Sequence, residues 1–152
     1  MIIEYYRLRE GALPPVRSNP SDAGLDVFYC PENGESKTIS PGENAVLQTG
    51  LKFGVPHGNM LQVMNRSGMA AKKSVVVGAH CVDSGYDGEV FIDMHNIGTE
   101  SQTLEPGDKI AQVVMVPVVS FRALETKVDD LYNWEAITIS RRGDGGFGST
   151  GQ

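Results

Sequence analysis

The sequence has only two cysteines, Cys30 and Cys81, and no long apolar run. Two cysteines cannot build a disulfide framework, so nothing in the cysteine content indicates an oxidising compartment. No segment approaches the roughly 20 apolar residues that a membrane-spanning helix needs. The first residues, Met1–Glu4, lack the basic start of a secretory signal. We therefore expect a cytoplasmic protein.

Positive charge is also scarce, with 13 Lys and Arg against 19 Asp and Glu, a net charge of −6. This balance argues against a general nucleic-acid or membrane surface. The few cations are unevenly placed, and six of them lie in or beside glycine-containing polar stretches: Arg66, Lys72, Lys73, Lys109, Arg141 and Arg142. Their placement indicates a small anionic ligand. For Lys72 and Lys73, simple solvated lysines are the alternative.

Glycine and proline are abundant, with 18 and 8 residues, and they separate many short apolar segments. Short strands with Pro-Gly turns at regular spacing are typical of an all-β sandwich, jelly roll or barrel. Helix formers cluster only at residues 65–73, where we expect one short helix. We expect a single β domain over residues 1–140 and a flexible, glycine-rich arm over residues 141–152.

The stretch from Val77 to Glu89 is a candidate functional loop. Two strand patterns separated by Asp and Gly predict a β-hairpin that turns near Asp83. The three histidines stand apart and show no metal-ligand spacing, and no nucleophile elbow surrounds a serine. Hydrolysis would then need a carboxylate that activates water, and Asp83 is the candidate. The alternative is that Asp83 only caps its own turn.

Two other polar segments could bind anions. Asn65–Gly68 opens the expected helix, where backbone N–H groups are unpaired; alternatively Ser67 caps the helix and Arg66 is a surface residue. The glycine-rich tail could wrap phosphates, with Arg142 as a charged fork and Phe147 closing over a flat ligand. A disordered tail is the alternative.

Five motifs in order carry a resemblance to a known family. They are Ala23-Gly24-Leu25-Asp26, Arg66-Ser67-Gly68, Val82-Asp83-x-x-Tyr86-x-Gly88, Gly107-Asp108-Lys109-Ile110-Ala111-Gln112, and Arg142-Gly143-x-Gly145-Gly146-Phe147-Gly148-Ser149-Thr150-Gly151. This series, which spans nearly the whole chain, resembles the trimeric dUTPases.

The resemblance implies a jelly-roll homotrimer with shared active sites that converts dUTP and water to dUMP and pyrophosphate with Mg²⁺. Such an enzyme limits uracil incorporation into DNA and supplies dUMP. By position, Asp83 would activate the water, Tyr86 would pack under the deoxyribose, and Asp26 would lie near the Mg²⁺-triphosphate, through water. The backbone from Gly78 to Val82 would read the uracil. The remaining implied substrate contacts are Arg66, Ser67, Gly68, Gln112, Arg142, Phe147, Gly148 and Ser149.

The sequence departs from the family at Asn65, His80 and Cys81. Residues 79–85 also resemble the related dCTP deaminases, in which Asp93 would take the place of the catalytic glutamate. Ala71, at the place of a deaminase arginine, and the glycine-rich tail favour the dUTPase; a deaminase or bifunctional enzyme is the alternative. A third possibility is a nucleotide-dependent regulatory protein that contacts a partner through the loop 129–135.

Overall fold

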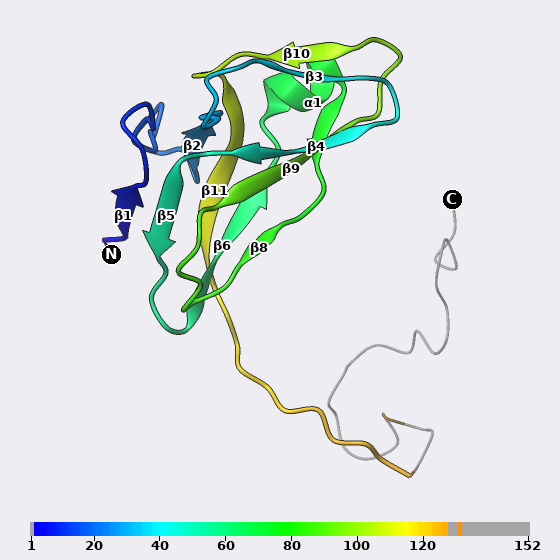
Figure 1. Ribbon diagram of the computed structural model, residues 1–152. Coiled ribbons are helices and arrows are strands. Elements are labelled where there is room, and N and C mark those ends of the chain that lie inside the picture. The colour runs from blue at the N-terminus through cyan, green and yellow to red at the C-terminus, as the bar shows by residue number, and fades with distance from the viewer. Residues whose placement is uncertain (1, 128–130, 132–152) are drawn as a thin grey trace. The chain divides into compact units, whose positions relative to one another are not determined.

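The computed structural model describes residues 2–127 and 131, which form short strands and one short helix (Figure 1). The strands are β1 (Glu4–Arg7), β2 (Leu25–Phe28), β3 (Lys37–Ile39), β4 (Asn44–Gln48), β5 (Leu51–Gly54), β6 (Asn59–Met64), β7 (Val75–Val77), β8 (Cys81–Val82), β9 (Phe91–Asn96), β10 (Gln102–Leu104) and β11 (Lys109–Pro117). The helix is α1 (Ser67–Lys73).

Two sheets form the body of the domain. One has the strand order β2-β11-β6-β8, the other β4-β9-β7, and two-stranded sheets β1-β5 and β3-β10 flank them. The pairs are antiparallel. Within the described part of the chain the sheets do not close into a barrel. The expected all-β sandwich with one short helix is confirmed.

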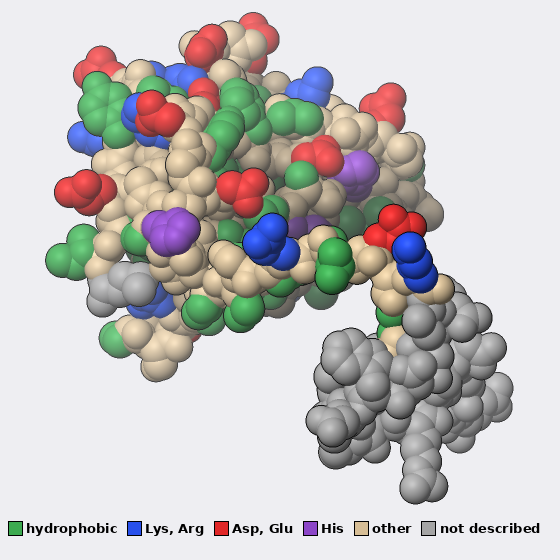
Figure 2. Space-filling view, turned by 90° about the horizontal axis from the view of Figure 1, so that it is seen from below, with side chains coloured by type: hydrophobic (Ala, Val, Ile, Leu, Met, Phe, Trp, Pro, Cys, Tyr) green, Lys and Arg blue, Asp and Glu red, His purple; other side chains and the backbone are tan. Residues whose placement is uncertain are grey.

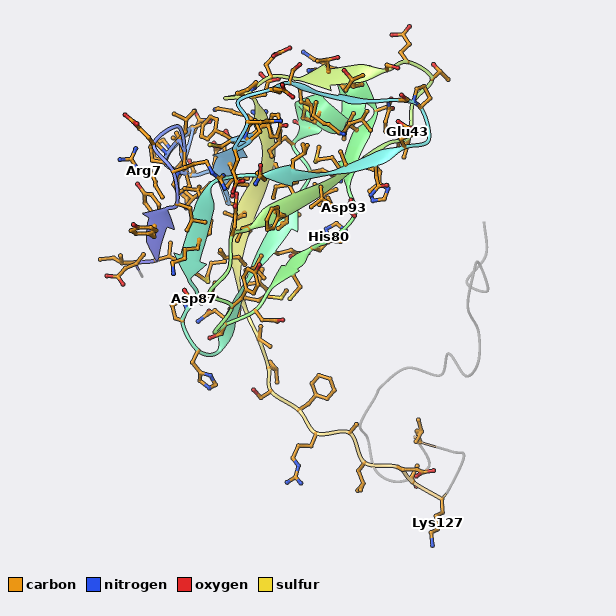
Figure 3. The ribbon with its side chains drawn as sticks, viewed as in Figure 1. Arg7, Glu43, His80, Asp87, Asp93 and Lys127 are labelled. Carbon is orange, nitrogen blue, oxygen red and sulfur yellow. The ribbon has the colours of Figure 1, made fainter. Side chains whose placement is uncertain are left out.

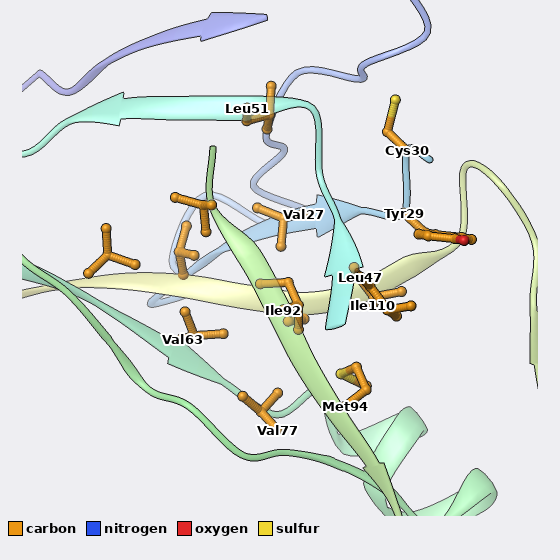
Figure 4. Packing of buried hydrophobic residues seen from close by; sticks show 14 of the residues in the cluster. Val27, Tyr29, Cys30, Leu47, Leu51, Val63, Val77, Ile92, Met94 and Ile110 are labelled. Atoms are coloured by element: carbon orange, nitrogen blue, oxygen red, sulfur yellow. The ribbon is translucent and has the colours of Figure 1, made fainter. Parts of the chain in front are cut away.

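The hydrophobic core lies between the two larger sheets (Figure 4). Val27 and Val63 come from the four-stranded sheet, and Leu47, Ile92 and Met94 from the three-stranded sheet; each is at most 2% exposed. Along β9, buried residues alternate with more exposed ones, as a strand with one face inside requires. The apolar alternation in the sequence therefore fixes which face of each sheet is internal.

The helix α1 begins directly after Arg66, whose backbone is extended (φ −90°, ψ 133°) and which makes no side-chain cap. Ser67 is thus the first helical residue and not the cap. The alternative interpretation, that Ser67 caps the helix, is therefore wrong. The Arg66 side chain is engaged elsewhere, by Asp26. Met69 is buried and attaches the helix to the core.

The hairpin predicted around Asp83 is replaced by a wider connection. β7 does pair with β9, with Val77 opposite Met94, but residues 78–90 intervene. Within them β8 crosses to the other sheet and pairs with β6, with Leu61 opposite Val82. Val82 is buried there, so the gain from burying its side chain favours the other sheet over a tight hairpin. His80 and Asp87 lie toward the two ends of this connection (Figure 3).

By backbone contacts the chain divides into Met1–Ser120 and Phe121–Gln152. The expected boundary after residue 140 and the arm fall in the second unit and outside the described residues. That division stays a prediction. No helix in the described part of the chain is long and apolar enough to cross a membrane.

Candidate active site

Asp26, on the strand β2, is the most densely contacted carboxylate of the predicted site. Arg66 Nε lies 2.9 Å from its Oδ1, and Lys109 Nζ lies 2.8 Å from its Oδ2. Ser18 Oγ donates a further hydrogen bond to Oδ2 at 3.0 Å. With 9% exposure, the carboxylate is buried between two cations.

These contacts keep Asp26 ionised. Burial alone would raise the pKa of Asp26, but hydrogen bonds from Lys109 and Ser18 and the charge of Arg66 outweigh it. The pKa therefore lies below its usual value. At neutral pH the group carries a full negative charge beside two positive charges.

The register of the four-stranded sheet gathers three of the predicted motifs. On β11, Gln112 pairs with Asp26 of β2 on one side and with Met64 of β6 on the other. Arg66 follows Met64 by two residues, and Gln112 Nε2 donates to the backbone oxygen of Asn65 at 2.9 Å. Segments far apart in the sequence thus meet at one end of β6.

Together they line a hollow of about 220 Å³, here called the anion hollow. Its residues are Ser18, Asp22, Asp26, Arg66, Ser67, Gly68 and Gln112. The lining is mostly polar, and Arg66 stands where the first N–H groups of α1 begin. Such a hollow suits phosphate oxygens, which accept hydrogen bonds from guanidinium, amide and backbone donors.

A second hollow of about 210 Å³, here called the Tyr86 hollow, lies on the connection between β7 and β9. It is lined by Cys81, Val82, Asp83, Tyr86, Glu89, Val90 and Phe91. The Tyr86 N–H donates to the Asp83 carbonyl at 3.2 Å, and Gly85 between them has φ +89°, as a type II turn requires. Within the described part of the chain Asp83 therefore belongs to a turn, but its exposed carboxylate does not cap it.

The Asp83 carboxylate has one side-chain partner among the described residues. Cys81 Sγ donates to its Oδ1 at 3.3 Å. This hydrogen bond raises the pKa of the Cys81 thiol, which stays protonated as a donor. Among the described residues, no hydrogen-bond partner contacts the second oxygen of this carboxylate.

The two hollows of one chain lie apart and share no lining residue. Asp83 follows Val82, which pairs with Leu61 in β6, whereas Arg66 lies beyond Met64 at the end of that strand. From Leu61 to Met64 the strand alone extends about 10 Å, at roughly 3.3 Å per residue. Within one chain, the predicted base therefore lies away from the predicted phosphate contacts.

Gly78 lies at the end of β7, where the predicted base-reading backbone begins. Its N–H donates to the Asp93 carbonyl at 2.8 Å, and a Cβ there would stand 2.3 Å from His95 Nε2. Asp93 itself accepts a hydrogen bond from Asn44 at 3.0 Å and pairs with His95 at 2.9 Å. These two contacts hold the pKa of Asp93 below its usual value, so it stays an anion.

Other parts of the predicted site lie outside the described residues, namely Arg142, Phe147, Gly148 and Ser149. Conversely, sequence reasoning missed Ser18 and Lys109 as partners of Asp26, and Asn65 as the partner of Gln112. Lys109 was recognisable as a cation in a glycine-containing motif. Its pairing with Asp26 depends on strand register, which the sequence does not reveal.

The dUTPase family model matches residues 11–151 of the chain. The chain belongs to the dUTPase family. It is 37% identical to the deoxyuridine 5'-triphosphate nucleotidohydrolase of Clostridium tetani over 147 residues, covering 95% of this chain and 93% of that protein. It is 35% identical to the mouse (Mus musculus) protein of the same name over 150 residues, covering 99% and 85%.

Solved dUTPase structures have the same fold. The Staphylococcus bacteriophage 80alpha dUTPase with dUpNHpp superimposes with a TM-score of 0.83 at 26% identity, covering 99% of both chains. A mutant dUTPase of phage phi11 of S. aureus, whose structure shows the coordination of a structural Mg(II) ion, gives a TM-score of 0.76 at 24% identity, covering 86% of this chain and 99% of that one.

In this dUTPase-family chain, the sheet register brings three of the five motifs that carry the resemblance together around Asp26 and Gln112. On the face shown in Figure 2, lysine and arginine side chains are scattered among acidic and apolar ones and form no basic patch among the described residues. That distribution suits a small anionic ligand in a hollow better than a nucleic-acid strand.

Proposed function

We propose that this chain hydrolyses dUTP to dUMP and pyrophosphate by attack of water on the α-phosphorus. The observation that carries the proposal is the register that aligns Gln112 with Asp26 and Met64, placing the anion hollow at the place where the family motifs meet. The family match over residues 11–151 supports the same reaction.

We further propose that each active site combines two copies of the chain. A general base must lie within hydrogen-bond reach, about 3 Å, of the water it deprotonates. In one chain, Asp83 and Arg66 are separated along β6, so the Asp83 of one copy would face the anion hollow of another. A closed, cyclic homotrimer provides such a repeated heterologous contact.

In this site the residues act in sequence. Arg66, Ser67 and Gln112 hold the phosphates by charge-assisted hydrogen bonds and orient the α-phosphorus. Asp83 takes a proton from the water molecule while the water oxygen forms a bond to the α-phosphorus. The bond from that phosphorus to the bridging oxygen breaks, and pyrophosphate leaves with its electron pair. Tyr86 packs under the deoxyribose and excludes a 2′-hydroxyl.

Mg²⁺ fits the anion hollow as a partner of the substrate. Asp26 and Asp22 supply the hard carboxylate oxygens that Mg²⁺ prefers. Asp26 is already held by Arg66, Lys109 and Ser18, so we propose that it meets the ion through water while the triphosphate supplies direct ligands. When bound, the ion neutralises phosphate charge.

The arm completes the site in this proposal. Arg142 would contact the γ-phosphate, and Phe147 with Gly148 and Ser149 would close over the uracil. The backbone from Gly78 to Val82 would read the base edge. Closure excludes bulk water and strengthens the electrostatic contacts inside.

The test is product analysis with dUTP, dCTP, dTTP and UTP in parallel, each with and without Mg²⁺. Nucleotides are separated by chromatography, and pyrophosphate is assayed. We expect dUMP and pyrophosphate from dUTP with Mg²⁺, and much slower turnover of the other three. Absence of dUTP turnover would overturn the proposal and leave a regulatory binding protein.

The deaminase alternative is not favoured. Asp93 is fixed as an anion by Asn44 and His95, whereas a deaminase carboxyl must both take up and release a proton. Ala71 supplies no cation. The same product analysis distinguishes a dUTPase from a deaminase, because a deaminase would release dUTP or dUMP from dCTP.

A further inference from the structure

The Tyr86 side chain is held at its hydroxyl by the backbone that follows it. Its hydroxyl donates to the backbone carbonyl of Glu89 at 2.9 Å. The ring lies on the backbone of Gly88, where a Cβ would stand 2.4 Å from the Tyr86 hydroxyl. The far end of the ring is thus fixed by residues 88 and 89, while the Tyr86 N–H is fixed by the Asp83 carbonyl.

Glu89 is itself held by a two-pronged contact with Arg9. Arg9 Nη1 lies 2.9 Å from Glu89 Oε1, and Nη2 lies 2.7 Å from Oε2. The Gly50 N–H adds a third bond to Oε1 at 2.7 Å. The Arg9 and Glu89 side chains are only 18% and 10% exposed. Such forked, partly buried pairs fix geometry more firmly than exposed single contacts.

The anchor extends into the body of the domain. Arg9 Nη1 also donates to the Cys30 carbonyl at 2.8 Å. The hydrogen bond to Glu89 raises the pKa of Arg9 despite its burial, so the guanidinium remains charged. Next to Glu89, the Val90 carbonyl accepts from Thr49 Oγ1 at 2.6 Å. Residues 89 and 90 therefore cannot shift without breaking contacts to the segment 49–51.

We infer that Arg9 and Glu89 are positioning residues for sugar discrimination, because they fix the Glu89 carbonyl that holds the Tyr86 ring. This inference rests on the proposed function, in which Tyr86 packs under the deoxyribose. A tyrosine held at its hydroxyl and at its backbone N–H cannot retreat to admit a 2′-hydroxyl. With the charge pair broken, the ring would gain that freedom, and UTP would become a better substrate relative to dUTP.

The test measures kcat/KM for dUTP and for UTP in wild type, Tyr86→Phe, Glu89→Gln and the double variant. Tyr86→Phe keeps the ring and removes its hydroxyl. Loss of one hydrogen bond is expected to lower the dUTP-to-UTP preference roughly fivefold in each single variant. Because both changes act through the same bond, the double variant should be no worse than either single one.

Asp87→Asn is the matched control. Asp87 lies in the same loop as Tyr86, but its exposed ion pair with Lys52 does not involve the Glu89 carbonyl. Its preference should equal that of wild type. Circular dichroism melting verifies folding, and Arg9→Lys, which keeps the charge but loses the fork, replaces Glu89→Gln if that variant does not fold.

Three results would overturn the inference. Folded Glu89→Gln or Arg9→Lys with wild-type preference would show that the charge pair does not position the ring. Additive losses in the double variant would show that Glu89 acts by another route than the Tyr86 hydroxyl. A wild-type protein that does not turn over dUTP would contradict the proposed function itself. This result is distinguishable from the first two because it is seen without any substitution.

Discussion

Asp26 and Arg66, 40 residues apart in the sequence, meet through a 2.9 Å hydrogen bond between Arg66 Nε and Asp26 Oδ1. This contact joins the first two motifs of the family resemblance across the four-stranded sheet. It also turns the Arg66 side chain away from open solvent and toward the anion hollow. A structural ion pair and a candidate phosphate contact are thus the same group, so their effects must be separated by experiment.

Stability should depend on pH through Asp26. The folded-state pKa of Asp26 is lowered, so its contribution is fully present above the unfolded value of about 3.9 and is lost as pH falls through the lower, folded pKa. Asn at this position cannot titrate. We expect Asp26→Asn to be less stable than wild type by about 1–3 kcal/mol at pH 7.

This difference should shrink below about pH 4, where protonation removes the charge from wild-type Asp26 as well. Urea unfolding of both proteins between about pH 7 and pH 2.5 measures it. A difference that stays constant over the whole range would show that the charge of Asp26 does not stabilise the fold.

The chemistry should depend on Asp83 far more than binding does. Asp83→Asn keeps the size of the side chain but removes the proton acceptor, so kcat should fall by roughly 10³-fold. The side chain is exposed, so the melting temperature should be nearly unchanged. Calorimetric titration with a non-hydrolysable dUTP analogue should give a Kd close to that of wild type. Near-normal turnover would remove Asp83 from the role of base.

The arm should contribute to turnover and not to folding. A chain that ends before Arg142 should lose turnover, because the site would stay open to water and lack a cation for the γ-phosphate. Its melting temperature should stay within about 2 °C of the full chain, which corresponds to less than about 1 kcal/mol. Phe147→Ala, which keeps the arm, provides the control for the aromatic contact alone. Full activity in the shortened chain would contradict the closing arm.

Much of this fold could be predicted from the sequence because its signals are local. Short apolar segments indicated the strands, helix formers indicated α1, and Pro-Gly turns indicated the breaks between strands. The pairing of β8 with β6 could not be predicted, since it depends on which sheet best buries Val82. The wide connection that replaces a tight hairpin is therefore determined by contacts between residues distant in the sequence.

The candidate site shows the same limit. Asp26, Arg66 and Gln112 were identifiable by their motifs, but their meeting depends on the register of β2, β11 and β6. The pairing of Lys109 with Asp26 and of Arg9 with Glu89 joins residues distant in sequence and has no local signal. The roles assigned to the arm stay predictions, because its residues lie outside the described part of the chain.

The central claim is that the Asp83 of one copy works in the anion hollow of another. The direct test mixes two inactive variants, Asp83→Asn and Arg66→Gln, after unfolding and refolding them together. If sites are shared, a site with Arg66 from the first variant and Asp83 from the second is intact. Random assembly of equal amounts would then restore about a quarter of wild-type activity. If each chain instead carries a whole site, every site in the mixture keeps one defect. A mixture as inactive as its two components would therefore contradict the account.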